Sequence, residues 1–188
     1  MMSKIKPALV LAVITTVIAA LLIVAHNLTY VDTSGIITED MAEKCRLLMG
    51  EGEFSIVTDW KAEGYAIDKP DTVEKLIKKE DGTLAFQIIA NGYSKGGLDM
   101  LIAMNSDGSV KGITILKIGE TPGLGTKVND DEFLSLFEGA VGEVKIVKNA
   151  PAADNEIQAV TSATYSSKGV ASAVNTALQT YREMEVSK

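Results

Sequence analysis

The sequence has few of the residues that build redox or metal centres in proteins. A single cysteine, Cys45, among 188 residues excludes an intramolecular disulfide framework, a thiolate iron–sulfur site and a CxxC redox pair. A single histidine, His26, excludes a His-rich zinc site and argues against a catalytic triad built on histidine. The side chains of this protein therefore offer neither a thiol pair nor a metal centre for redox chemistry.

The chain is also short of positive charge. It has 18 basic and 25 acidic residues, which give a net charge of -7, and its pI is about 4.8. Nucleic acid is not an expected partner, because its phosphates would be repelled. The mean hydropathy is nevertheless +0.16, which is high for so charged a chain. This mismatch predicts that the apolar residues are concentrated in one stretch.

That stretch runs from Pro7 to Ala25, 19 residues without a charge. As a helix it would extend about 28 Å, close to the hydrocarbon thickness of a bilayer. A cleaved signal peptide is the alternative interpretation. However, the run is longer than the usual apolar region of about 7–15 residues, and no clear A-x-A cleavage site follows it. We therefore predict an uncleaved membrane anchor.

The charges around this run predict its orientation. Lys4 and Lys6 precede it, whereas no lysine or arginine follows until Lys44. The positive-inside rule then places the N-terminus in the cytoplasm and the rest of the chain outside. Without residues 1–26 the chain keeps 16 basic and 25 acidic residues, so the outer part has a net charge of -9.

The outer part has the length and patterning of one α+β domain with an antiparallel sheet and flanking helices. Turn residues predict two hairpins, whereas the pattern of residues 51–70 does not assign a helix or a strand there. Helix remains an alternative for residues 73–79, because Asp71 and Glu74 could form a capping box. The predicted elements are, in order, a helix over 36–49 capped by Thr38, strands over 73–79, 83–90, 98–104 and 110–117, a short helix over 130–137, strands over 143–147 and 157–160, and a helix from Ser167 to about Glu183 capped by Ser166 or Ser167.

Two loops have compositions that are typical of functional sites. The first is ETPGLG, residues 120–125, in which one proline and two glycines form a tight turn around Leu124. An ordinary strand-ending turn would explain the glycines, but Leu124 would suit a lid over a flat apolar ligand.

The second loop is TSATYSS, residues 161–167, in which six of seven residues carry hydroxyls before the last helix. A helix N-terminus stabilises phosphate, although a simple capping turn would have a similar composition. The loop lacks the Gly-Lys pair of a P-loop.

Together these loops resemble those of a known family. TSAT, residues 161–164, resembles the S/T-G-A-T motif of FMN-binding domains, whose last threonine carries FMN through a phosphoester bond. ETPGLG is similar to the other motif of those domains, and GYSKGG, residues 92–97, resembles their G-Y-x-G segment with extra length. With the N-terminal anchor, the chain resembles the G subunits of Rnf ion-translocating electron transport complexes, over the anchor and roughly residues 83–175.

The resemblance implies a flavoprotein subunit of a redox-driven ion translocase rather than a complete enzyme. A separate flavin transferase would deliver FMN from FAD to Thr164, and the subunit would relay electrons within a membrane complex that oxidises or reduces ferredoxin and NAD, coupled to Na+ or H+ transport. Its partners would be other membrane and iron–sulfur subunits of the Rnf complex. The implied organisation is a cytoplasmic tail over 1–6, a single transmembrane anchor over 7–26, a membrane-proximal part over 27–80 and an extracytoplasmic FMN-binding domain over 81–188. The implied cofactor-binding residues are Thr164, Thr161, Ser162, Ala163, Ser166, Ser167, Glu120, Thr121, Gly123, Leu124 and Gly125.

The sequence departs from the family pattern at two positions. Ser162 replaces the usual glycine, and a serine is accommodated there if its φ is negative. Gln158 stands where an acidic residue often precedes the motif. Three alternatives remain open: the C subunit of the Na+-translocating NADH:quinone reductase, a separate anchored FMN-binding reductase, and an anchored binding or structural module without flavin.

Overall fold

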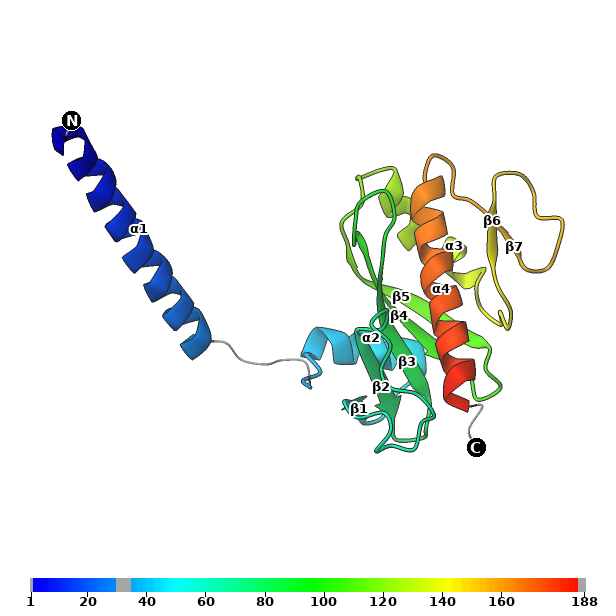
Figure 1. Cartoon of the computed structure of the whole chain (residues 1–188). Coiled ribbons are helices and arrows are strands. Elements are labelled where there is room, and N and C mark those ends of the chain that lie inside the picture. Colours follow the sequence, from blue (N-terminus) through cyan, green and yellow to red (C-terminus); the bar gives the residue numbers. More distant parts are fainter. Residues whose placement is uncertain (1, 30–34, 186–188) are drawn as a thin grey trace. The chain divides into compact units, whose positions relative to one another are not determined.

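The computed structural model describes residues 2–29 and 35–185, which belong to two separate units (Figure 1). The first unit contains the helix α1 (Met2–Thr29), and the second begins at Gly35. The elements of the second unit are α2 (Glu39–Met49), β1 (Phe54–Val57), β2 (Lys75–Lys79), β3 (Leu84–Ala90), β4 (Leu98–Met104), β5 (Val110–Ile118), the 3-10 helix η1 (Gly125–Asn129), α3 (Asp131–Ser135), β6 (Lys145–Val147), β7 (Glu156–Gln158) and α4 (Thr164–Glu185).

Helix α1 contains the apolar run expected to cross a membrane. Its segment Leu9–Thr29 is long and apolar enough to do so, and none of this segment is buried within the protein. Thr15 and Thr16 donate their hydroxyl hydrogens to backbone carbonyls about one turn earlier, at 2.8 to 3.0 Å. The two polar side chains of the run are therefore compatible with a lipid environment.

The second unit is built on a five-stranded antiparallel meander in the order β1-β2-β3-β4-β5. Both predicted hairpins are present, and Gly82 and Gly108 take positive φ angles of 89° and 81° at their turns. Residues 75–79 are a strand, so the helical alternative for this segment is wrong. Strand β1 was not predicted, because it is a four-residue edge strand in which only Val57 is fully buried.

One helix packs on each face of this sheet (Figure 1). The predicted helix at residues 36–49 is α2, whose first turn is capped by Thr38 and which ends at Gly50. It packs Met41, Cys45 and Met49 against a small apolar cluster on the sheet. Burial raises the pKa of the Cys45 thiol to about 11, so this cysteine is an unreactive core residue.

The other face is covered by α4, which buries the larger core. The predicted apolar stripe is confirmed, since Val170, Val174 and Leu178 are fully buried against the sheet. The predicted start is wrong, because the helix begins at Thr164 and not at Ser167. Ser166 and Ser167 lie inside the first turn, where their hydroxyls bind other partners and do not cap the helix.

The remaining elements connect β5 to α4. The predicted short helix is present as α3, preceded by η1, and the last two predicted strands pair in parallel as β6 and β7. The boundary expected between residues 80 and 81 falls at the tip of the β2–β3 hairpin, so both of its sides contribute to one sheet. The loop between β3 and β4, the segment after β5 and the start of α4 lie at the same end of that sheet (Figure 1).

Candidate functional site

A pocket of about 360 Å³ lies where these three segments meet. The β3–β4 loop contributes one wall, residues 120–125 another, and the start of α4 with its preceding loop the third. The lining residues are Tyr93, Glu120, Thr121, Leu124, Gly125, Ser162, Ala163, Thr164, Tyr165 and Ser166. Two loops that are about 40 residues apart in the sequence are thus brought to one cavity.

Eight of the eleven residues implied by the motifs line this pocket, and Thr161, Gly123 and Ser167 do not. Thr161 and Gly123 are exposed beside it, whereas Ser167 is buried behind it. The pocket also contains two residues that sequence reasoning missed, Tyr93 and Tyr165. Tyr93 lies within the GYSKGG segment and Tyr165 directly follows the TSAT motif, so their position in or beside these motifs was the available signal.

Glu120 holds the three walls together. Its carboxylate accepts hydrogen bonds from the backbone amides of Tyr93 and Ser94, each at 3.0 Å, and a short one from the Ser166 hydroxyl. These donors come from the β3–β4 loop and from the first turn of α4, while Glu120 itself begins the ETPGLG segment. Glu120 is only 5% exposed, so losing one of these bonds would leave a buried polar group unsatisfied.

Glycines make room for this carboxylate. A Cβ atom at Gly92 or Gly125 would lie 2.8 or 2.7 Å from atoms of Glu120, and one at Gly97 would lie closer still. Such distances are shorter than any normal contact between non-bonded carbon and oxygen. Gly92, Gly97 and Gly125 are therefore required by their close approach to Glu120.

The environment keeps Glu120 ionised. Burial alone would raise the pKa of its carboxyl group, but the hydrogen bonds from Ser166, Ser94 and Tyr93 outweigh burial and hold the pKa below its usual value. Glu120 is the only charged residue in the pocket lining. It therefore places a fixed negative charge, already bonded to three donors, at the base of the site.

Thr164 is the first residue of α4 and is half-buried in the pocket wall. Among the described residues, no acceptor bonds the backbone amides of Thr164, Tyr165 or Ser166, whereas the Ser167 amide donates to the carbonyl of Ala163. Free amides and the helix dipole make this end of α4 favourable for an anion. The Thr164 hydroxyl thus lies where a phosphate would be stabilised.

Two expectations about neighbouring serines are not met. Ser167 is buried, and its hydroxyl donates to the carbonyl of Ala163 and accepts from the amide of Val160, so it is unavailable to a ligand in the pocket. Ser162 takes a positive φ of 65°, so the condition that its φ be negative fails. It is the one non-glycine residue with positive φ among the described residues. Glycine would adopt this conformation without strain, which explains why the related motif has glycine there.

The mouth of the pocket is apolar and exposed. Tyr93 and Tyr165 are 76% and 69% exposed, and Leu124 is 46% exposed. The two tyrosine rings contact each other edge to face, with centroids 6.4 Å apart. The expected apolar contact at Leu124 is therefore one of three such side chains around the opening.

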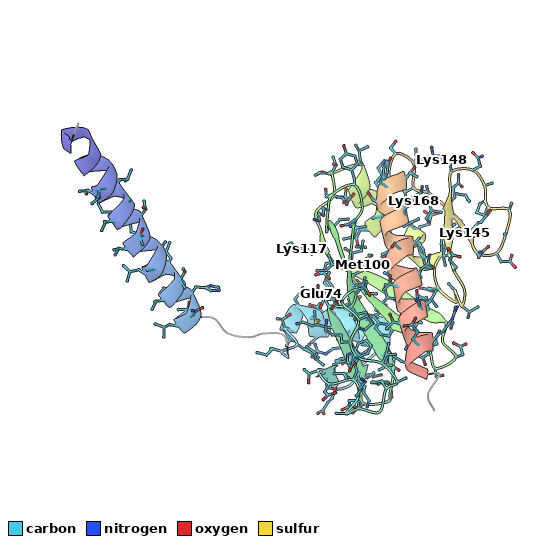
Figure 2. The ribbon with its side chains drawn as sticks, in the orientation of Figure 1. Glu74, Met100, Lys117, Lys145, Lys148 and Lys168 are labelled. Carbon is cyan, nitrogen blue, oxygen red and sulfur yellow. The ribbon has the colours of Figure 1, made fainter. Side chains whose placement is uncertain are left out.

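Positive charge lies outside the pocket. Lys168, one turn after Thr164, is exposed and borders the groove between α4 and β6, in the same region as Lys145 and Lys148 (Figure 2). Within residues 2–29 and 35–185, no group of three His, Cys, Asp or Glu side chains could hold a metal ion. The site thus combines a threonine at a helix start, a buried carboxylate and an apolar rim.

Comparison with known proteins agrees with this arrangement. Residues 92–179, which contain both loops and Tyr93, match the FMN-binding domain family. The G subunit of the Na(+)-translocating ferredoxin:NAD(+) oxidoreductase complex of Acetobacterium woodii is 31% identical over 95% of this chain and 92% of its own length. This chain belongs to the Rnf G-subunit family. It is a membrane-anchored member with one FMN-binding domain.

Two further similar proteins cover a smaller share of this Rnf G-subunit family member. The G subunit of the proton-translocating ferredoxin:NAD(+) oxidoreductase complex of Clostridium ljungdahlii is 32% identical over 54% of this chain and 56% of its own length. The solved C subunit of a Na(+)-translocating NADH-quinone reductase from Parabacteroides distasonis has a TM-score of 0.54 at 19% identity, over 79% of this chain and 84% of that chain. This likeness shows a shared fold and no more.

Proposed function

We propose that this chain is the flavin-carrying subunit of a membrane-bound, ion-translocating ferredoxin:NAD(+) oxidoreductase complex, with FMN joined to Thr164 by a phosphoester bond. The position of Thr164 carries the proposal, because it is the first residue of α4 and shares a pocket with the ETPGLG segment. The name of the Acetobacterium woodii relative supports the choice of complex.

The residues present fit an FMN phosphate. A phosphodiester on the Thr164 hydroxyl would keep one negative charge beside the unbonded amides of the first turn of α4. The carboxylate of Glu120 keeps its negative charge, so the free amides and the positive end of the α4 dipole would have to offset its repulsion of the phosphate. Ser166 is held by that carboxylate, so the backbone amides are the donors left for the phosphate oxygens.

Attachment of the flavin requires a second protein. A threonine hydroxyl is a weak nucleophile without a positioned base, and none of the pocket residues is a histidine. A flavin transferase would supply the base and use FAD as donor. The Thr164 oxygen would bond to the FMN phosphorus, the pyrophosphate bond would break, AMP would leave, and the hydroxyl proton would pass to the transferase.

When bound, FMN supplies one- and two-electron transfer that the side chains of this protein lack. The protein would position the group. The start of α4 would hold the phosphate, while Thr121, Leu124 and Gly125 would border the ring. Covalent attachment would keep the flavin in place outside the cytoplasm, where no flavin pool would replace it.

The apolar helix α1 and the charges on either side of it support a position of this chain at the cell membrane. Helix α1 would span the bilayer once, with Lys4 and Lys6 on the cytoplasmic side and the FMN-binding domain outside. Other membrane and iron–sulfur subunits of the complex would exchange electrons with the flavin. The names of the two bacterial relatives give different coupling ions, Na(+) and protons, so the proposal covers either ion.

The proposal is tested by replacing the acceptor threonine. Full-length wild type, Thr164→Ala and Thr176→Ala are each co-expressed with a flavin transferase and denatured before their flavin fluorescence is measured in a gel. Thr176 is a matched control, since it is also half-buried on α4 but does not line the pocket. We expect fluorescence in the wild type and in Thr176→Ala, and none in Thr164→Ala. Equal fluorescence in Thr164→Ala would contradict the proposal.

A further inference from the structure

Exposed aromatic rings are confined to one place among the described residues. Other aromatic side chains of the domain, such as Trp60, Phe86 and Phe137, are buried in its core. Tyr93 and Tyr165 are instead more than two-thirds exposed, and both line the pocket that contains Thr164. An exposed ring forgoes the burial that usually stabilises aromatic residues, so two adjacent ones at a pocket mouth mark a contact surface.

The geometry of the two rings suits a flat ligand. Their planes are inclined at 70° with centroids 6.4 Å apart, so the rings form two sides of a corner. A planar ring that stacks on one tyrosine would present its edge to the other, which are the two favourable arrangements of aromatic pairs. Leu124, which comes from the ETPGLG segment, adds an apolar side chain at the same opening.

The backbone segments that carry the two tyrosines are hydrogen-bonded to the same buried carboxylate. The backbone amide of Tyr93 donates directly to Glu120, and Tyr165 lies between Thr164 and Ser166, whose hydroxyl donates to Glu120. The two rings therefore come from segments 72 residues apart in the sequence, but both segments are hydrogen-bonded to Glu120. Because Glu120 also belongs to the ETPGLG segment, the corner formed by the two rings keeps its position relative to Thr164.

We propose that Tyr93 and Tyr165 are positioning residues that hold the isoalloxazine ring of the flavin on Thr164, one by stacking and the other by edge contact. This inference rests on the proposed function, since it takes Thr164 as the point of attachment. Residue Tyr165 directly follows Thr164, and Tyr93 stands on the facing loop. The pocket then receives the phosphate and the chain that links it to the ring, while the ring lies at the exposed mouth.

Flavin fluorescence provides a readout that a purely structural role of the tyrosines would not change. An excited flavin takes an electron from a tyrosine in contact with it, and the electron then returns, so the fluorescence lifetime is shortened. Phenylalanine keeps the ring and the stacking but is too hard to oxidise. Tyr93→Phe, Tyr165→Phe and the double variant therefore preserve packing and remove quenching.

The experiment uses the full-length protein in detergent after co-expression with a flavin transferase. Intact mass first establishes that each variant carries one FMN residue, and time-resolved fluorescence then measures the lifetime of the flavin. Tyr181→Phe is the matched control, because Tyr181 lies on the same helix, 16 residues and roughly 24 Å beyond Tyr165. A second pair of variants, Tyr93→Leu and Tyr165→Leu, is examined by fluorescence anisotropy, which reports how freely the ring rotates.

We expect a severalfold longer lifetime in at least one of the single Phe variants, the longest lifetime in the double variant and no change in Tyr181→Phe. The Leu variants should show faster loss of anisotropy. Flavin present on Thr164 with unchanged lifetimes and anisotropy in all four single variants would overturn the inference, and would assign the tyrosines to contact with another subunit. Absence of FMN from Thr164 in the wild type would overturn the proposed function, and the inference with it.

Discussion

Carboxylate side chains at the two ends of the sheet accept hydrogen bonds from different kinds of donor. At the hairpin end, Asp81 and Asp107 each accept a bond from the backbone amide two residues later, and both are exposed. At the pocket end, Glu120 is buried and accepts from residues 26, 27 and 46 positions away in the sequence. The hairpin carboxylates stabilise their own turns, whereas Glu120 joins three separate segments. The pocket end should therefore be much more sensitive to substitution.

Removing the carboxylate at each end gives the largest expected difference. Glu120→Ala leaves two part-buried amides and the buried Ser166 hydroxyl without an acceptor, so we expect the free energy of unfolding to fall by about 3–5 kcal/mol. Asp107→Ala, at the other end, removes the acceptor of the amide and hydroxyl of one residue, Ser109, and should cost about 1–2 kcal/mol. Urea unfolding of the full chain in detergent measures both, followed by the fluorescence of Trp60, the only tryptophan, which is 2% exposed.

If Glu120→Ala and Asp107→Ala lowered the free energy of unfolding by similar amounts, Glu120 would not stabilise the domain more than the hairpin carboxylates do. Flavin loading offers an independent check, because only the variant at the pocket end should lose FMN. A Glu120→Ala protein that unfolds normally and still incorporates FMN fully would show that the three walls are held by other contacts.

Filling the space around Glu120 should have the next largest effect. A Cβ at Gly97 would clash with the Glu120 carboxylate and lie 3.1 Å from the backbone oxygen of Ser94. We expect Gly97→Ala to lower the free energy of unfolding by about 1–3 kcal/mol through overpacking. Gly142→Ala is the control, since no atom lies within 4 Å of a Cβ there. A change of more than about 0.5 kcal/mol in the control would indicate a general effect of replacing glycine.

Acidic pH should destabilise the pocket end of the sheet because it protonates Glu120. Because its folded-state pKa is lowered, this carboxyl contributes stability that is present above its unfolded pKa of about 4.3 and is lost as the pH falls through the folded value. We expect the melting temperature of Glu120→Gln to depend less on pH than that of the wild type between about pH 5 and 3. Asp81 and Asp107, whose pKa values are also lowered by turn hydrogen bonds, titrate in both proteins. Parallel melting curves would show that Glu120 does not titrate in this range.

The smallest expected effect is a gain in stability at Ser162. Its positive φ of 65° strains a residue that has a Cβ atom. Ser162→Gly should raise the free energy of unfolding by about 0.5–1 kcal/mol, after the greater freedom of glycine in the unfolded chain is counted. Ser162→Ala keeps the strain and should not show this gain. Destabilisation by glycine would mean that the serine side chain makes a contact that outweighs the strain.

Local signals in the sequence were sufficient to predict most of the fold. The turn residues at 80–82 and 105–109, the cap at Thr38 and the apolar stripe of α4 each act within a few residues, and the structure contains all of them. The edge strand β1 was missed because only Val57 is fully buried in it. The start of α4 was misplaced because Ser166 bonds Glu120, a partner 46 residues away that no local pattern reveals.

The candidate site was predictable only in part, for the same reason. The motifs identified the two loops and placed Thr164 in the loop just before the last helix. They did not reveal that Glu120 bonds the β3–β4 loop, that Ser167 is buried or that Ser162 has positive φ. Tyr93 and Tyr165 were also not recognised, because their exposure and mutual contact depend on the folded chain.

The point at which the flavin is attached can be located directly on the chain. Lys148 and Lys168 are both exposed, and trypsin cleavage after them releases residues 149–168, which contain Thr161 and Thr164 (Figure 2). Fragmentation of this peptide by tandem mass spectrometry distinguishes the two threonines. We expect one FMN residue on Thr164 in protein purified from membranes that contain the flavin transferase. An unmodified peptide, or FMN on Thr161, would contradict this expectation.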